Sequence, residues 1–276
     1  MNGYSHLAEM SAIKWMKRHE VPYVLYINGG TIKKECSLKR KIKTRYISGA
    51  SCYLSPDEES NKYLIHYGAN PEKIFNYPYS TIYENEIVSE KPNKDDLRKE
   101  LGISFDKVFV SSGQLIARKN YISLVKEWKN FPENYGFFLI GDGKQRAEIE
   151  NLIKAENLKN VVLTGFLPRE QMFKYFQAAD AFLFPSKEDI YGHVINEALS
   201  QGIPVISTNK VNSAVKLIND KNGILLDSLT GKEFKDAVET VLKNDAFKAC
   251  IETAKENTLE KMAEEHVKIL NEVIGK

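Results

Sequence analysis

Residues 187–206 (KEDIYGHVINEALSQGIPVI) place carboxylates on both sides of a glycine. Asp189 and Glu197 are eight positions apart, with Glu188 beside the first and Gly192 between them. A carboxylate accepts two hydroxyl hydrogen bonds at once, so two such groups suit the hydroxyls of a sugar and a ribose. The alternative interpretation is that Glu188 and Asp189 only cap a helix that begins near Gly192.

A basic pair, Arg118 and Lys119, lies within residues 111–128 (SSGQLIARKNYISLVKEW). The pattern predicts a strand that ends in Gly113 and a helix that begins near Tyr121, so the pair lies on a strand-to-helix loop. The planar fork of arginine and the point charge of lysine together suit a diphosphate, whose charge they neutralise without a metal. An ordinary solvated basic pair is the other interpretation.

A glycine-rich stretch, FFLIGDGKQRAEIENL, follows another predicted strand. Gly141 and Gly143 invite comparison with the dinucleotide fingerprint, but Arg146 stands where its third glycine is required. The stretch therefore does not indicate a hydride-transfer enzyme, and a tight loop beside a nucleotide is the remaining functional interpretation. Phe166 and Leu167, in GFLPREQM, lie at another strand end, where backbone groups suit the edge of a nucleobase.

These residues need a scaffold of strands and helices to bring them together. Short apolar runs alternate with amphipathic stretches, which predicts a parallel sheet with helices on both faces. Ligands bind outside the carboxyl ends of the strands in such a sheet. The expected strands are 21–27, 52–55, 108–112, 136–141, 161–165, 181–186, 204–207 and 223–226.

The strands divide unevenly along the 276 residues. Six follow a polar stretch at 84–96, which reads as a linker, and only two precede it. We therefore expect a partial α/β domain with the linker at 1–90 and a complete doubly wound domain at 91–245. Residues 246–276 are expected to form one long helix that packs back toward the N-terminal part.

Together these motifs resemble the C-terminal half of the GT-B glycosyltransferases, specifically the retaining family 4 (glycosyl transferases group 1). The order runs from a G-x-L loop with Arg/Lys, through LIGxG, VxLTGFL, ADAFLFPS and acid-x7-Glu, to ALSxGIPVI. The resemblance implies a Rossmann-like domain that binds a nucleotide-sugar. Residues 26–80 resemble the end of the family's acceptor domain, whose earlier strands have no counterpart here, so we expect a shortened transferase.

The resemblance assigns roles residue by residue. Arg118 and Lys119 would hold the donor diphosphate, Glu197 the ribose, and Asp189 the sugar ring, with Glu188 as a competing candidate. Three departures from the family pattern are Asp189 for Glu, Gln114 for Arg and Asn120 for Gly. The other expected donor-binding residues are Gly113, Gln114, Gly141, Gly143, Phe166, Leu167, Glu188, Ile190, Tyr191, Gly192, His193 and Val194.

Composition and charge indicate which kinds of partner the protein is expected to bind. A net charge of +2 does not indicate nucleic-acid binding. No apolar stretch is long enough to span a membrane, no signal peptide is visible, and the three cysteines lack metal-ligand spacing. These features predict a cytoplasmic protein with neither a metal site nor a cofactor. Residues 33–45 carry seven Lys or Arg and one Glu, which suits either a solvated helix face or docking on anionic lipid.

The sequence thus predicts transfer of a sugar from a nucleotide-sugar to a glycan or lipid-linked acceptor, with retention of configuration, in bacterial surface polysaccharide synthesis. Two alternatives stay open. One is a non-catalytic nucleotide-sugar-binding module, either a remnant or a subunit that awaits a partner, and the other, ranked lower, is a nucleotide-sugar epimerase. A homo-oligomer and a complex with a partner subunit are both considered for the assembled protein.

Overall fold

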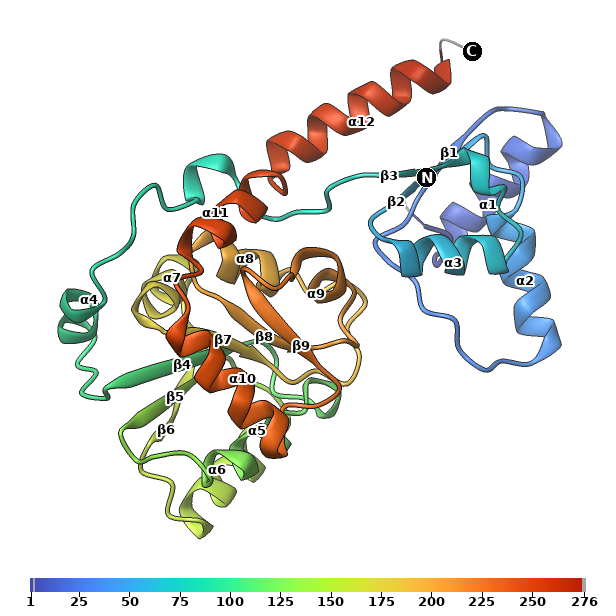
Figure 1. Ribbon diagram of the computed structural model, residues 1–276. Coiled ribbons are helices and arrows are strands. Elements are labelled where there is room, and N and C mark those ends of the chain that lie inside the picture. The colour runs from blue at the N-terminus through green and yellow to red at the C-terminus, as the bar shows by residue number, and fades with distance from the viewer. Residues whose placement is uncertain (2, 275–276) are drawn as a thin grey trace. The chain divides into compact units, whose positions relative to one another are not determined.

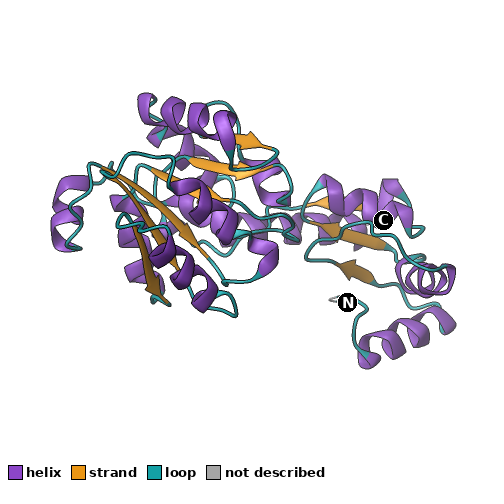
Figure 2. Ribbon diagram, turned by 90° about the horizontal axis from the view of Figure 1, so that it is seen from below, coloured by secondary structure: helices purple, strands orange, loops and turns teal. Residues whose placement is uncertain are grey.

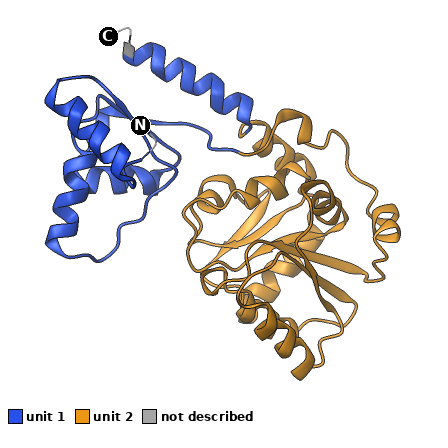
Figure 3. Ribbon diagram, turned by 180° about the vertical axis from the view of Figure 1, so that it is seen from behind, with its two compact units in different colours: residues 1–80, 258–276 blue, residues 81–257 orange. Residues whose placement is uncertain are grey.

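The computed structural model describes residue 1 and residues 3–274. The chain forms two compact units, one of residues 1–80 with 258–276 and one of residues 81–257 (Figure 3). We call them unit 1 and unit 2. The predicted domain boundaries lay at 90 and 245 instead. Ile82 belongs to the buried core of unit 2, and so do Cys250 and Ala254, which explains why both ends of unit 2 extend beyond those boundaries.

Unit 2 contains a six-stranded parallel sheet with the order β6-β5-β4-β7-β8-β9 (Figure 1). All six strands expected in this region are present, with end positions that differ by a few residues. This order reverses direction between β4 and β7, as in a doubly wound Rossmann sheet. The strands are β4 (Lys107–Ser112), β5 (Tyr135–Ile140), β6 (Val161–Gly165), β7 (Ala181–Phe184), β8 (Val205–Thr208) and β9 (Gly223–Leu226).

Helices cover both faces of this sheet, as Figure 2 shows. Alternate side chains of β4 enter different cores: Val108 and Val110 pack with α7, α8, α9 and α11, whereas Phe109 packs with α5, α6 and α10. The second core includes Trp128, which is fully buried and donates its indole N–H to the Tyr135 carbonyl at 3.1 Å. The helices are α4 (Lys94–Glu100), α5 (Tyr121–Trp128), α6 (Arg146–Ala155), α7 (Arg169–Ala178), α8 (Val194–Ser200), α9 (Asn212–Leu217), α10 (Gly231–Lys243) and α11 (Phe247–Lys255).

Unit 1 contains a smaller parallel sheet with the order β1-β2-β3. The sequence predicted only two strands here, which is wrong, because the third strand is three residues long and lies between two prolines. The first expected strand is also shorter than predicted. The elements are α1 (Leu7–Arg18), β1 (Val24–Tyr26), α2 (Ser37–Ile47), β2 (Cys52–Ser55), α3 (Glu58–His66), β3 (Ile74–Asn76) and α12 (Leu259–Ile274).

The single long helix expected after residue 245 is wrong, because the chain forms α11 and α12 with a break at residues 256–258. Polar side chains replace helical hydrogen bonds at the break. Asn257 donates its amide to the Thr253 carbonyl at 2.8 Å, and the Thr258 hydroxyl accepts the Lys261 N–H at 3.1 Å. Helix α12 belongs to unit 1, where Ile269 is buried with residues of its sheet.

Candidate functional site

The predicted site residues gather at the carboxyl edge of the unit 2 sheet, where the strand order reverses. Arg118 and Lys119 follow β4 in a short 3₁₀ turn (Ala117–Lys119), and Asp189 follows β7. Since β4 and β7 are neighbours, their carboxyl ends meet at the crevice where doubly wound sheets bind ligands. This topology brings together side chains that are seventy positions apart in the sequence.

Glycines allow the loops after β4 and β5 to lie directly against each other. A Cβ on Gly141 would stand 2.1 Å from the Gly113 carbonyl oxygen, and one on Gly143 would stand 2.6 Å from the Leu115 carbonyl oxygen. Backbone hydrogen bonds close the contact, from Gly113 N–H to the Ile140 carbonyl at 3.0 Å and from Leu115 N–H to the Asp142 carbonyl at 2.9 Å. The predicted glycine-built loop after β5 is therefore held against the loop after β4 by close backbone contacts and hydrogen bonds.

Both cations of the basic pair contact one carboxylate. The Lys119 ammonium forms an ion pair with Asp189, and an Arg118 guanidinium nitrogen lies 3.3 Å from the same oxygen. Lys119 is buried, lies 4.3 Å from the centroid of the Phe184 ring, and has a pKa lowered by burial despite the adjacent carboxylate. Arg118 is more exposed, with 45% of its side-chain surface accessible. The pair is thus anchored at Lys119 and open to solvent at Arg118.

Backbone contacts fix the loop after β7 against the 3₁₀ turn that carries the pair. The Ser186 hydroxyl lies 3.1 Å from the Arg118 carbonyl, and the Lys187 N–H donates to that carbonyl at 2.8 Å. Asn120, where many family members carry glycine, has φ of 60° and ψ of 27°. This left-handed conformation is one that asparagine tolerates better than other non-glycine residues.

Glu197 belongs to a second charged cluster, on the first turn of α8. Its carboxylate lies 2.7 Å from the Arg169 guanidinium, which also lies 2.6 Å from Glu86. Only 14% of the Glu197 side-chain surface is accessible. Burial raises the pKa of Glu197 even though Arg169 opposes the shift. Asp189 and Glu197 therefore have separate cationic partners and separate surroundings.

The remaining predicted residues occupy several environments along the same edge. Gln114 is exposed after β4, and Phe166 is 79% exposed after β6. Ile190 is 55% exposed, whereas Tyr191 is 3% exposed and lies with its ring 5.0 Å from that of His193. Burial lowers the pKa of His193.

Four further predicted residues are partly buried: Leu167, Glu188, Gly192 and Val194. Helix α8 begins at Val194, two residues after the position expected.

Sequence reasoning missed Arg169 and Glu86. Arg169 opens α7 directly after the loop that follows β6, within the GFLPREQM stretch that was considered only for its backbone groups. A basic residue at a helix start after a strand was the available signal. Glu86 lies in the stretch expected to be a linker, and nothing in its local sequence indicates that it pairs with Arg169.

Comparison with known proteins shows which protein family this chain resembles. The family model of glycosyl transferases group 1 matches residues 93–263. The 2-deoxystreptamine N-acetyl-D-glucosaminyltransferase of Niallia circulans is 33% identical over 127 residues, which are 46% of this chain and 33% of that protein. The alpha-D-kanosaminyltransferase of Streptomyces kanamyceticus is 27% identical over 176 residues, 62% of this chain and 45% of that protein.

Solved structures with the same fold cover nearly the whole chain. Anabaena HepE in complex with UDP has a TM-score of 0.82 at 18% identity and covers 100% of this chain and 78% of its own. Sucrose-phosphate synthase of Thermosynechococcus elongatus has a TM-score of 0.79 at 19% identity, with 99% and 73% coverage. The α/β fold is thus of the GT-B type. The chain spans less than half the length of the two curated relatives named above.

The family match covers more than half of the chain and includes every motif between Gly113 and Ile206 that carried the resemblance. It confirms the resemblance to glycosyl transferases group 1, and the chain belongs to that family.

Proposed function

We propose that this protein transfers a sugar from a nucleotide-sugar donor to a glycan or lipid-linked acceptor, with retention of configuration and without a metal. One observation carries the proposal: Arg118 and Lys119 converge on Asp189 at the carboxyl edge between β4 and β7. The bond that must break joins a diphosphate to a sugar ring. The two cations suit the diphosphate, and the adjacent carboxylate of Asp189 suits the hydroxyls of the sugar.

In the proposed reaction the donor diphosphate competes with Asp189 for the two cations. The bond between the anomeric carbon and the diphosphate oxygen breaks, and the electron pair leaves with the diphosphate. Lys119 and Arg118 stabilise the negative charge that develops there. The acceptor hydroxyl forms the new bond, and its proton passes to the departing diphosphate. Asp189, released from the cations, accepts a hydrogen bond from a sugar hydroxyl.

Glu197 is proposed to hold the ribose, and its raised pKa gives this role a pH signature. A carboxylate accepts the hydroxyl bonds better than a protonated acid, so nucleotide affinity should fall as the pH drops through a pKa above that of ordinary glutamate. Calorimetric titration with UDP, GDP and ADP over a pH series measures this dependence. Glu197→Gln should bind one nucleotide more weakly and lose this titration.

The same titration tests the function itself. The nucleotide phosphates also titrate, but they do so equally for both chains, so the difference between wild type and Glu197→Gln isolates the carboxylate. If no nucleotide binds to folded wild-type protein, the donor site is absent and the proposal is wrong. If a nucleotide binds equally to both chains at every pH, Glu197 does not hold the ribose.

We also propose that α2 docks this protein on anionic lipid, where lipid-linked acceptors reside. Among the described residues, no helix is both long and apolar enough to cross a membrane. Helix α2 instead exposes 67% of Leu38 and 43% of Ile42, one turn apart, beside exposed Lys39, Arg40 and Lys41. Apolar residues flanked by basic ones are typical of helices that lie in the membrane interface.

Not every basic residue of this segment is available to lipid. The Lys43 ammonium lies 2.8 Å from Glu35 and donates to the Tyr67 hydroxyl at 3.0 Å. Its positive charge is therefore already paired with a carboxylate within unit 1. The docking surface is therefore the part of α2 that carries Lys39, Arg40 and Lys41.

Vesicle co-sedimentation can measure this docking. Each basic residue near an anionic surface contributes about 1 kcal/mol, so Lys39→Ala with Arg40→Ala should lower affinity for phosphatidylglycerol vesicles about 30-fold. Lys14→Ala with Lys73→Ala removes the same charge from exposed positions elsewhere in unit 1 and should have little effect. Equal losses from the two pairs, or equal binding to phosphatidylcholine vesicles, would contradict docking through α2.

A further inference from the structure

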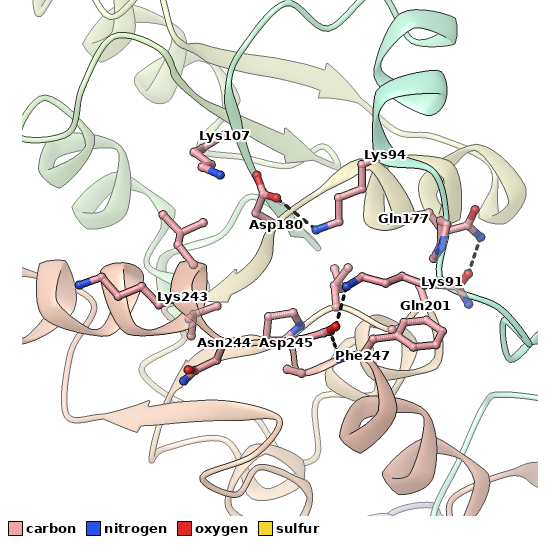
Figure 4. Close-up of a pocket in the computed structure, with 17 residues that line it drawn as sticks. Lys91, Lys94, Lys107, Gln177, Asp180, Gln201, Lys243, Asn244, Asp245 and Phe247 are labelled. Atoms are coloured by element: carbon pink, nitrogen blue, oxygen red, sulfur yellow. Dashed lines mark hydrogen bonds and ion pairs between the residues drawn. The ribbon is translucent and has the colours of Figure 1, made fainter.

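A cavity of about 290 Å³ lies at the edge of the unit 2 sheet opposite the candidate site (Figure 4). The amino ends of three strands contribute to its wall, through Lys107 of β4, Asp180 before β7 and Pro204 before β8. The junction of α10 and α11 completes it. None of the residues predicted to bind the donor lines this cavity, so it is a separate feature of the same domain.

Positive charge predominates in the cavity wall. Four lysines line it, against two aspartates. Both aspartates already have their partners: Asp180 lies 3.1 Å from Lys94 and 2.8 Å from Arg98 and accepts the Val108 N–H, as Figure 4 shows for the lysine. Asp245 lies 2.8 Å from Lys91 and accepts the Phe247 N–H at 3.2 Å. The carboxylates are thus neutralised and do not define a cation site.

Two of the lysines, Lys107 and Lys243, form no ion pair with either aspartate of the wall. Within the described part of the chain, the Lys107 ammonium has neither a hydrogen bond nor an ion pair. Among the residues that the structure describes, Lys243 forms one ion pair, with Glu239 at 3.6 Å on an exposed helix face. Burial also lowers the pKa of Lys94, although Asp180 opposes the shift. Four lysine charges minus two aspartate charges leave the wall with a formal charge of +2.

We propose that this cavity binds the phosphate group of a small molecule. A phosphate dianion would match the excess charge, and it would offset the cost of keeping Lys94 charged in a partly buried position. Lysine ammonium groups bind phosphate as point charges and do not require a fixed fork geometry. The phosphate would come either from inorganic phosphate or from a phosphate monoester, whose organic part would contact the apolar wall that Ile203, Leu242 and Phe247 provide.

The decisive variant is Lys107→Gln, because this lysine has no partner in the described structure that its loss would leave unpaired. The proposed donor site also takes phosphate, so the measurement is made in full-length protein that carries Lys119→Ala. Inorganic phosphate and phenyl phosphate are titrated calorimetrically at constant ionic strength. Loss of one charged contact should weaken phosphate binding about tenfold. Lys154→Gln, on the exposed face of α6, is the matched control and should leave the affinity unchanged.

Each result decides the proposal. A loss confined to Lys107→Gln supports it, and the two probes then distinguish the sources: tighter binding of phenyl phosphate indicates a monoester, and equal or weaker binding indicates free phosphate. Equal losses from Lys107→Gln and Lys154→Gln would show unspecific charge attraction and overturn the site. So would an affinity that Lys107→Gln does not change, or no binding at millimolar phosphate by protein that circular dichroism shows to be folded.

Discussion

Lys119→Ala is expected to lower the rate of sugar transfer by a factor of about 10² to 10³, the effect of removing one group that stabilises a developing negative charge. Lys119 is buried against the Phe184 ring, and its ammonium is held by Asp189. Its position is therefore set before the donor arrives, which avoids reorganisation when the diphosphate departs. Release of nucleoside diphosphate in the presence of acceptor measures the rate.

Controls for this result come from the same part of the chain. Lys126→Ala removes an equal charge from an exposed position on α5 and should leave the rate unchanged. Arg118 remains beside Asp189 in the Lys119→Ala protein, so the carboxylate keeps a partner and the fold should survive. A folded Lys119→Ala protein with a normal rate would remove this lysine from the mechanism. A tenfold weaker nucleotide affinity with an unchanged rate constant would assign it to ground-state binding instead.

Gly141→Ala is expected to lower the free energy of unfolding of unit 2 by roughly 2–6 kcal/mol. Backbone strain at a sparsely populated φ contributes about 1–3 kcal/mol, and overpacking contributes about as much again. The φ of Gly141 is 133°, and its new Cβ would stand 2.1 Å from a carbonyl oxygen of the β4 loop. Because the obstacle is backbone, the loops themselves must separate. Urea denaturation, followed by the fluorescence of Trp128 in protein whose other tryptophan is replaced by Trp15→Phe, measures the change.

Gly102 provides a control that separates the effect of backbone strain from the effect of a steric clash. It also has a positive φ, 67°, but apart from Gly102 itself and its two chain neighbours, no heavy atom of the described residues lies within 4 Å of the position that a Cβ would take. Gly102→Ala should therefore cost only about 1–2 kcal/mol, the left-handed penalty by itself. Equal costs for the two substitutions would mean that the loops after β4 and β5 are not in contact through Gly141.

Sequence periodicity was sufficient for the unit 2 sheet because each of its strands is a short, mainly apolar run between helical patterns. The same reasoning failed at β3, where the run is only three residues long and its pairing with β2 supplies what local propensity does not. Asn120 illustrates another limit: the sequence marks it as a departure from glycine, but only the structure shows that it adopts a left-handed conformation, with φ of 60°.

Charge pairing was the least predictable aspect of the site. The spacing of Asp189 and Glu197 pointed to two carboxylates, whereas the structure gives them different partners, the basic pair and Arg169. Arg169 is 28 positions before Glu197 and 83 after Glu86, so no local pattern connects the three. Such pairs depend on which loops share a sheet edge, and that is decided by strand order rather than by neighbouring residues.

Unit 1 is built from two separate stretches of chain, and this determines the order in which the units can be completed during synthesis. Residues 81–257 emerge from the ribosome as one continuous segment that contains every strand of unit 2. Unit 1 must wait for residues 258–276, because Ile269 packs with Cys52, Leu54 and Tyr77, and the His266 ring lies 4.6 Å from that of Tyr77. Until α12 is made, those apolar side chains lack its cover, and exposed apolar surface of this kind is prone to aggregation.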